Sequence, residues 1–386
     1  MVPNGWVVKN LDSIYRVIDS LHQTPSFSKD GEYRMVRVTD IKGKNLDLSN
    51  AVRVSKEVFL EYTKKYKPKR NDILFSRVGS YGISSFVDTD QEFCLGQNTV
   101  IAESNDQANP IYIFNVLKSE GIRRQVEKTV DGSSHKTVSL KVIKYLKIPL
   151  APRKEQNKIA QILSTWDQAI SATEKLLENS QQQKKALMQE LLTGKKRLLD
   201  ENGVKFSDEW QRIELGLLLD YQQPTPYLVE STAYSDSYET PVLTAGKTFI
   251  LGYTNESSGI YQDQLPVIIF DDFTTDSKYV NFPFKAKSSA MKILTAKKGV
   301  SIKFVFEAMQ MLQFTVGGHQ RHWISIFSNL VIPLPNKKEQ QKIAEVLSLA
   351  DQEIETLQKK LDCLQQEKKA LMQQLLTGKK RVKVAA

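Results

Sequence analysis

The chain contains few of the residues that build covalent or metal-based frameworks. Among its 386 residues only Cys94 and Cys363 are cysteines, so the sequence predicts neither a disulfide framework nor a cysteine-rich zinc site. The four histidines have no metal-ligand spacing; they are His22, His135, His319 and His322. No third ligand stands near the closest pair, so no metal is expected.

Long apolar runs are also missing. No stretch approaches the roughly 18 residues of a membrane span, and the N-terminus does not follow a signal-peptide pattern. We therefore expect a cytoplasmic protein that does not contact a membrane. Lysine and arginine exceed the acidic residues and give a formal charge of +10, which favours an anionic partner such as nucleic acid.

The motifs of nucleotide and cofactor chemistry are absent as well. Residues 193–196 imitate only the end of a phosphate-binding loop, and no G-x-G-x-x-G follows a strand. The segment 109–112 is one residue from the Asn-Pro-Pro-aromatic motif of adenine methyltransferases, but we interpret it as a loop before a helix. Asp271, Asp272 and Asp276 are interpreted as turn caps rather than a nuclease metal site. The sequence thus predicts a binding protein, not an enzyme, without a cofactor.

One stretch occurs twice. Residues 148–197 return as residues 332–381 without a gap, with about thirty of some fifty positions identical. The repeat opens with Ile-Pro-Leu and Lys-Glu-Gln-x-Lys-Ile-Ala and closes with Leu-Leu-Thr-Gly-Lys-Lys-Arg. Two copies at this period are too few for a solenoid, so each copy is expected to follow a globular domain.

The repeat is predicted to be a long helix. Apolar residues recur every three or four positions, and neither glycine nor proline occurs from Arg153 to Thr193. In the second copy, Asn336 is expected to cap the helix while Glu339 reaches back in a capping box. Gly194 and Gly378 mark the predicted ends. About forty residues give a rod of roughly 60 Å.

A single rod of this kind is not stable alone. Two separate surface helices are one interpretation; the favoured one pairs the copies as a two-helix coiled coil, because their apolar stripes match in length and register. An antiparallel pair is expected, which relates the two globular parts by a pseudo-two-fold axis. The residues expected to make this pairing are Ile159, Leu163, Trp166, Ile170, Leu177, Ile343, Leu347, Ile354 and Leu361.

The expected architecture is a mixed α/β chain of the α+β class, with two globular domains separated by the paired helices in pseudo-two-fold arrangement. The expected domains are a first recognition domain (1–152), a central helix (153–197), a linker (198–209), a second recognition domain (210–336) and a C-terminal helix (337–381). Strands are predicted near 33–38, 72–77, 83–87, 98–102, 242, 249–253, 267–270 and 291–294, and helices at 55–66, 111–130 and 301–312. The two globular parts share little beyond this order of elements.

This pattern resembles the DNA-specificity subunit of type I restriction-modification systems. The resemblance covers nearly the whole chain, and the two copies of the repeat carry it, together with the tryptophan that opens each half (Trp6 and Trp210) and the strand at 72–77 with its glycine turn. It implies a non-catalytic subunit that recognises a bipartite, gapped site in double-stranded DNA. It also implies docking of two adenine methyltransferase subunits and, with them, nuclease-translocase restriction subunits. Methyl donor and ATP would then belong to these partners.

The candidate DNA contacts lie in polar loops. Their side chains can form hydrogen bonds with base edges or bind phosphates. In the first domain they are Ser76, Arg77, Ser80, Tyr81, His135 and Lys136; in the second they are Lys247, Thr274, Thr275, His319, Gln320 and Arg321. Ordinary solvated turns are the competing interpretation for each. Two rival functions stay open at this point: a self-contained adenine methyltransferase or nuclease, and a scaffold that binds only proteins.

Overall fold

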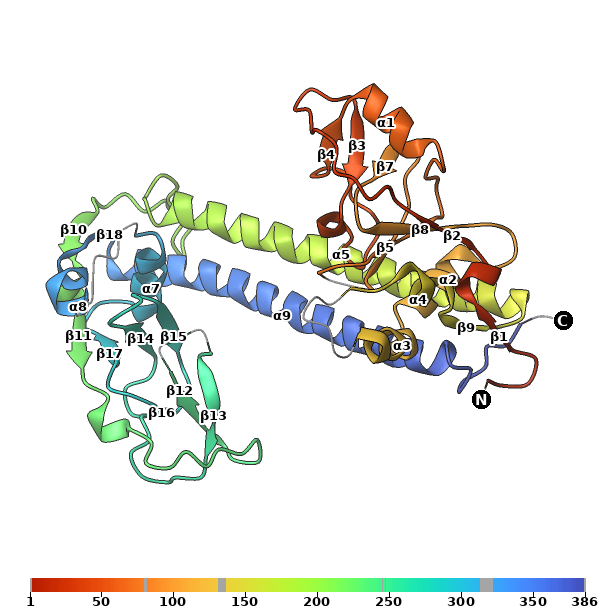
Figure 1. Ribbon diagram of the computed structural model, residues 1–386. Coiled ribbons are helices and arrows are strands. Elements are labelled where there is room, and N and C mark those ends of the chain that lie inside the picture. The colour runs from red at the N-terminus through yellow and green to blue at the C-terminus, as the bar shows by residue number, and fades with distance from the viewer. Residues whose placement is uncertain are drawn as a thin grey trace. The chain divides into compact units, whose positions relative to one another are not determined.

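The computed structural model describes residues 2–79, 82–130, 137–244, 246, 248–312 and 322–384 (Figure 1). The chain forms two compact units. The first comprises Met1–Glu174 with Lys360–Ala386, and the second comprises Lys175–Lys359. Within the described residues, no helix is both long and apolar enough to cross a membrane.

The globular part of the first unit, here called the first head, contains two larger sheets and the antiparallel pair β1-β9. Its four-stranded antiparallel sheet has the order β2-β8-β5-β6, and a three-stranded sheet has the order β4-β3-β7. The strands are β1 (Val7–Asn10), β2 (Arg16–Asp19), β3 (Tyr33–Val36), β4 (Val52–Val54), β5 (Ile73–Ser76), β6 (Ser84–Phe86), β7 (Phe93–Leu95), β8 (Thr99–Glu103) and β9 (Lys147–Leu150). The helices are α1 (Lys56–Thr63), α2 (Pro110–Leu117), α3 (Glu120–Val130) and α4 (Leu140–Lys144).

The second head repeats this topology. Its sheets have the orders β11-β17-β14-β15 and β13-β12-β16, with one antiparallel and one parallel pairing in the smaller sheet, as in the first head. The strands are β10 (Gln211–Glu214), β11 (Leu219–Gln222), β12 (Thr240–Leu243), β13 (Ile250–Thr254), β14 (Val267–Asp271), β15 (Ser277–Val280), β16 (Lys285–Ala286), β17 (Met291–Ala296) and β18 (Val331–Leu334). The helices are α6 (Leu215–Leu218), α7 (Ile302–Gln310) and α8 (His322–Ser325).

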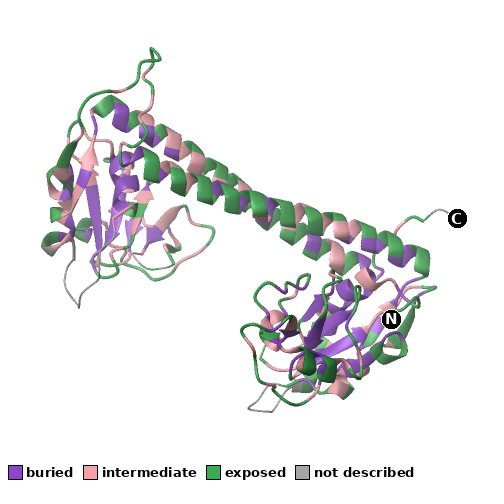
Figure 2. Cartoon of the chain, turned by 90° about the horizontal axis from the view of Figure 1, so that it is seen from above, coloured by how far each residue is buried: buried purple, intermediate pink, exposed green. Residues whose placement is uncertain are grey.

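The strands of the four-stranded sheets carry the buried interior of each head (purple in Figure 2). All residues of β5 and β14 are buried, and the apolar side chains of α2 and α7 cover one face of these sheets. Burial on both faces explains why these strands are nearly continuous apolar runs rather than alternating patterns. The α+β class predicted from the sequence is confirmed.

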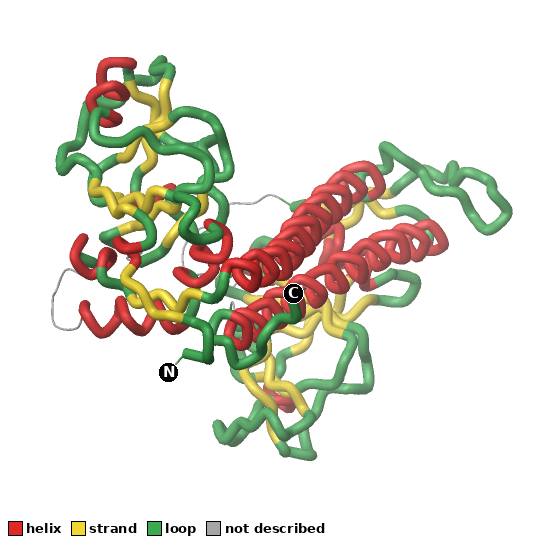
Figure 3. The backbone as a smooth tube through the Cα atoms, turned by 90° about the vertical axis from the view of Figure 1, so that its right-hand side faces the viewer, coloured by secondary structure: helices red, strands yellow, loops and turns green. Residues whose placement is uncertain are grey.

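The repeated segments form the two long helices, α5 (Arg153–Leu191) and α9 (Lys337–Leu375), each 39 residues long. Each contributes one part to each unit. In the first unit, Asp167 of α5 bonds Lys368 of α9; in the second, Lys184 of α5 bonds Asp351 of α9. Residue numbers rise along one helix as they fall along the other, so the predicted antiparallel packing is confirmed (red tubes in Figure 3).

Each head shares its core with both long helices. The first core contains Ile159 and Leu163 from the start of α5, and Leu375 and Leu376 from the end of α9. The second core contains the same repeat positions with the helices exchanged: Ile343 and Leu347 from α9, with Leu191 and Leu192 from α5. A helix start and the opposite helix end are therefore parts of one apolar interior, and this burial supplies the stability that a lone rod lacks.

A buried polar contact closes each core. In the second unit, the Glu339 carboxylate is fully buried and accepts two hydrogen bonds from Arg197, at 2.6 and 2.7 Å. Trp210 Nε1 donates to the same carboxylate at 3.1 Å. In the first unit Glu155, Arg381 and Trp6 make the corresponding contacts. We call each Glu-Arg-Trp set a clasp; it joins a helix start, the tail of the opposite helix and the strand that opens the head.

The clasp corrects one expectation. Asn336 does cap α9, because its side chain accepts the N–H of Glu339 at 2.9 Å. The Glu339 carboxylate does not reach back to complete the capping box, however; Arg197 and Trp210 take it. The predicted helix at 111–130 is also wrong as a single element, because the backbone turns at Lys118 and Ser119 and divides it into α2 and α3.

The two clasps should differ in strength because their burial differs. The Glu339→Gln substitution leaves Arg197, whose side chain is 17% exposed, without its counter-charge, and removing one partner of a buried pair costs about 3–5 kcal/mol. Glu155→Gln should cost about 1–2 kcal/mol, because Arg381 is 42% exposed and water screens the charge. Chemical unfolding of the two variants, with exposed Glu345→Gln as control, measures both.

The contribution of Glu155 to the free energy of unfolding should also fall in acid. Arg381 lowers the pKa of the Glu155 carboxyl, so its stabilisation is present above the unfolded pKa of about 4.3 and is lost as pH falls through the lower folded pKa. The difference between wild type and Glu155→Gln should shrink accordingly in acid. Equal losses for both glutamines at neutral pH would contradict the assigned burial.

Candidate nucleic-acid interface

Two equivalent hairpins present the candidate contact residues of the heads. In the first head, β5 and β6 are joined by residues 77–83; in the second, β14 and β15 are joined by residues 272–276. These strands hold the same places in the two sheets. Candidates that the sequence offered independently, at 76–81 and at 274–275, thus lie on corresponding hairpins.

In the first head the root of this hairpin is internally bonded. Ser76 is fully buried, and its Oγ donates to the Val78 carbonyl at 2.8 Å. The Arg77 side chain is 15% exposed; its Nη1 lies 2.9 Å from Asp19 Oδ2, and its Nε donates to the Val138 carbonyl at 3.1 Å. Both side chains therefore hold the hairpin in place, and the exposed part of the loop lies beyond them.

The segment that follows the glycine-marked loop bonds to the root of this hairpin. Thr137, immediately after that loop, forms an isolated bridge with Val78, and the Val138 N–H donates to the Arg77 carbonyl at 2.8 Å. Residues 77–78 and residues 137–138 therefore lie side by side, although about sixty residues separate them in the sequence.

The second head joins the same two segments through a different contact. Thr274 is exposed, and Thr275 adopts φ +64°, which is unusual for a β-branched residue and is most often found at functional turns. The Asp272 carboxylate accepts the backbone N–H of Trp323 at 2.9 Å. Trp323 closely follows the loop that contains candidates 319–321, so this head also bonds its hairpin to the segment after its second candidate loop.

Eight of the twelve candidate DNA-binding residues have no position in the described structure. Ser80, Tyr81, His135, Lys136, Lys247, His319, Gln320 and Arg321 lie outside the described residues. The roles of all the candidate side chains remain predictions. In each head the described contacts join the hairpin to a residue just after the pre-repeat loop: Val78 to Thr137, and Asp272 to Trp323.

The predicted helix-pairing residues occupy the inner faces of the long helices to different degrees. Six of the nine are buried: Ile159, Leu163, Leu177, Ile343, Leu347 and Leu361. Trp166, Ile170 and Ile354 are half-buried.

Sequence reasoning missed the residues that hold these loops. Asp19 accepts Arg77 and also lies 3.2 Å from His22 Nε2, but nothing at the end of a short strand distinguishes it beforehand. Phe273, 53% exposed beside the two threonines, could have been suspected as an aromatic residue in a polar turn. Asp271 accepts the Phe273 N–H at 2.9 Å and so caps the turn as predicted. The described residues contain no group of three His, Cys, Asp or Glu side chains able to hold a metal.

These features define a tandem recognition protein: two heads of one topology, each presenting loops at a sheet edge, mounted on a repeated and paired helix. The chain belongs to the type I restriction modification DNA specificity domain family, whose profile matches residues 3–180 and again residues 207–366. It is a specificity subunit, a non-catalytic component of a type I restriction-modification complex.

Relatives and solved structures agree with this assignment. The chain is 50% identical over 145 residues to the EcoR124I/EcoR124II specificity subunit of Escherichia coli, a match that covers 36% of this chain and 35% of that protein. It is 27% identical to the putative MjaX specificity subunit of Methanocaldococcus jannaschii over 99% of this chain and 95% of that one. The fold is similar to that of the S subunit from M. genitalium, with a TM-score of 0.68, 17% identity and 97% of both chains covered.

The anchoring role of Asp19 can be tested in the first head. Asp19→Asn removes the counter-charge of Arg77, and loss of a hydrogen bond to a charged group costs about 1.5–3 kcal/mol. Amide hydrogen exchange should accelerate in residues 77–83 and 137–138, while the β14–β15 hairpin keeps its rate. Exposed Asp30→Asn is the matched control in the same head. Unchanged exchange around Arg77 would show that the ion pair does not hold the loop.

Proposed function

We propose that the two heads read the two halves of a bipartite, gapped site in double-stranded DNA. One observation carries this proposal: the heads have the same strand order but different loop residues at corresponding hairpins. A common scaffold with different loops suits recognition of two different half-sites, because base readout depends on the few side chains that reach the groove.

The proposed contacts are candidate residues in polar loops of each head. In the first head they include Ser80, Tyr81, His135 and Lys136, and in the second Lys247, Thr274, Thr275, His319, Gln320 and Arg321. Ser76 and Arg77 contribute by holding the first hairpin, since their polar groups are bonded within the head. The formal charge of +10 supports binding to phosphates, which adds salt-dependent affinity without sequence information.

The helix pair supports a second part of the proposal. We infer that α5 and α9 dock two adenine methyltransferase subunits, and that restriction subunits join through them. The repeat positions that face away from the shared cores are exposed on both helices (green in Figure 2), so each copy of the repeat offers a similar surface. Methyl donor and ATP are then bound by the partners.

Mapping methylated adenines tests this function. The chain is expressed together with the methyltransferase encoded beside it, in cells lacking other adenine methylation. Wild type should give one split motif; Arg321→Ala should relax one half of that motif, because loss of a bidentate base contact costs about 1–3 kcal/mol of discrimination. His135→Ala should act on the other half.

Two results would count against the proposal. Equal weakening of both half-sites by Arg321→Ala would show a phosphate contact without readout. Methyl-donor binding by the purified chain would support the rival interpretation of a self-contained enzyme, and partner binding without any DNA selectivity would support a scaffold.

A further inference from the structure

The two units hold identical repeat residues against different neighbours. Lys184 and Lys368 occupy one position of the repeat, and Asp351 and Asp167 occupy another. In each unit the lysine of one long helix bonds the aspartate of the other. What surrounds this pair differs between the units.

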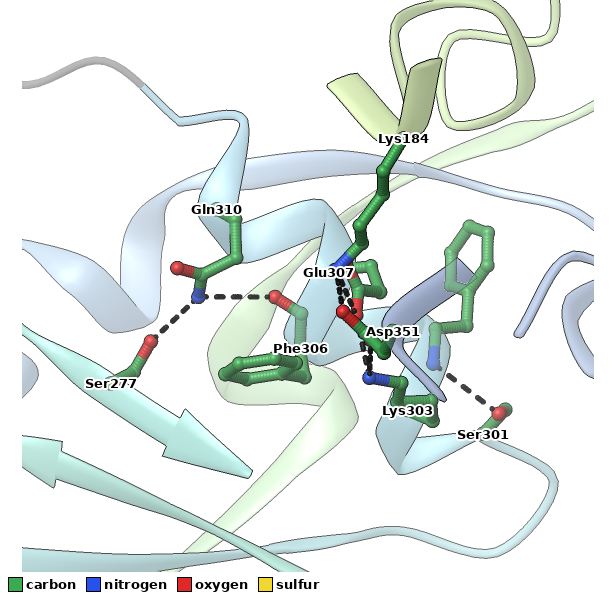
Figure 4. Close-up of polar contacts among 9 residues, drawn as sticks. Lys184, Ser277, Ser301, Lys303, Phe306, Glu307, Gln310 and Asp351 are labelled. Atoms are coloured by element: carbon green, nitrogen blue, oxygen red, sulfur yellow. Dashed lines mark hydrogen bonds and ion pairs between the residues drawn. The ribbon is translucent and has the colours of Figure 1, made fainter. Parts of the chain in front are cut away.

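In the second unit, α7 completes the pair with two further charges (Figure 4). Lys303 Nζ lies 2.8 Å from Asp351 Oδ2 and 2.6 Å from Glu307 Oε1, and Lys184 Nζ lies 3.1 Å from Glu307 Oε2. The Glu307 side chain is fully buried. Two lysines thus face two carboxylates, and their charges balance.

In the first unit the corresponding helix lacks these charges. α2 and α7 can be aligned through their N-caps, Asn109 and Ser301. The backbone N–H of Asn109 donates to Gln156 and that of Ser301 donates to Gln340, and these two glutamines occupy one position of the repeat. Counted from these caps, Asn115 stands where α7 has Glu307, and Ile111 stands where it has Lys303. On α2 there is therefore no carboxylate at the position from which Glu307 of α7 reaches the repeat lysine.

A groove lies at this place, between α2, α3 and the two long helices of the first unit. Eight basic and four acidic side chains line it, together with apolar residues such as Ile122 and Met372. α3 forms one wall of the groove. Among the described residues of the second unit, no helix forms such a wall beside α7.

Two polar groups in the groove lack a hydrogen-bond donor or a carboxylate partner among the described residues. Asn115 is 1% exposed, and its Oδ1 has no hydrogen-bond donor. Lys118 reaches into the groove over the Phe114 ring and has no carboxylate within ion-pair distance among the described residues. Although much of the side chain is exposed, partial removal of the ammonium from water, and then the charge of Lys368, lower the pKa of Lys118 to about 8.

We propose that this groove docks an acidic amphipathic helix of a partner protein, whose carboxylate lies beside Lys118 and Lys368 as Glu307 lies beside Lys184. In the second unit a carboxylate, that of Glu307, already lies beside the repeat lysine. The excess of basic over acidic side chains in the lining favours an acidic partner. The apolar part of the lining suits a helix with one apolar face better than a polynucleotide backbone. This inference rests on the proposed docking of methyltransferase subunits and makes the two docking positions unequal: one partner copy is held through the groove, and the other is not.

The full-length chain is titrated with the methyltransferase encoded beside it, and binding is followed by native mass spectrometry and calorimetry. This measures whether the two docking positions differ in affinity. Wild type should bind two copies in separate steps. Lys118→Glu should weaken the tighter step at least tenfold and leave the weaker step unchanged. Gln310→Glu, at the corresponding position of α7, is the matched control and should change neither step. The milder Lys118→Gln should weaken the same step to a smaller extent.

A second variant supplies the missing carboxylate from α2 itself. Ile111→Lys with Asn115→Glu transfers the charges of the second unit to the first; it should abolish the tighter step and raise the pKa of Lys118, read by NMR of the methylated lysines. Two equal steps in wild type, or no change with either Lys118 variant, would overturn the inference while leaving the proposed function intact. Altered salt dependence of DNA binding instead would assign the groove to phosphate. A wild type that binds no methyltransferase would overturn the proposed docking itself.

Discussion

The structure depends on one interaction made twice: a glutamate at the start of one long helix held by an arginine from the tail of the other. Glu339 with Arg197, and Glu155 with Arg381, place a helix start, an opposite helix end and a tryptophan of the head in one interior. Because the core of each head includes apolar residues from both helices, a head cannot complete its core from its own contiguous segment. Pairing of the helices and folding of the heads are therefore one process.

This dependence gives an internal reason for the near identity of the repeats. The sequence suggests that two identical rods meet identical partners, but most of the shared motif has a role inside the chain. The glutamate forms the clasp, and the following glutamine bonds the cap of α2 or α7. Gly194 and Gly378 adopt φ of +73° and +69° where the helices end, a conformation that favours glycine. Two heads with one topology pack against the same residues of the repeat, whereas their loops are free to differ.

The long helices and the α+β class follow from the sequence because apolar periodicity is a local signal, and the match between the two copies of the repeat predicts that the helices pair. The contacts that decide geometry do not follow, because their partners are distant. Glu339 fits a capping box by its spacing, yet an arginine 142 residues away takes its carboxylate. Arg77 looks like a free cation in a polar turn, yet Asp19 holds it. The sequence pattern identifies loops that can carry recognition; it does not identify which of their polar groups the fold has already used.

Charge reversal at the clasps tests this account most directly, because it asks which arginine belongs to which glutamate. Glu155→Arg alone should lower the melting temperature of the full chain through repulsion from Arg381. Adding Arg381→Glu should restore most of the loss, whereas adding Arg197→Glu should not, because Arg197 lies in the other clasp. Rescue by Arg197→Glu, or a wild-type melting temperature for Glu155→Arg, would contradict the assignment of each helix start to the opposite helix end.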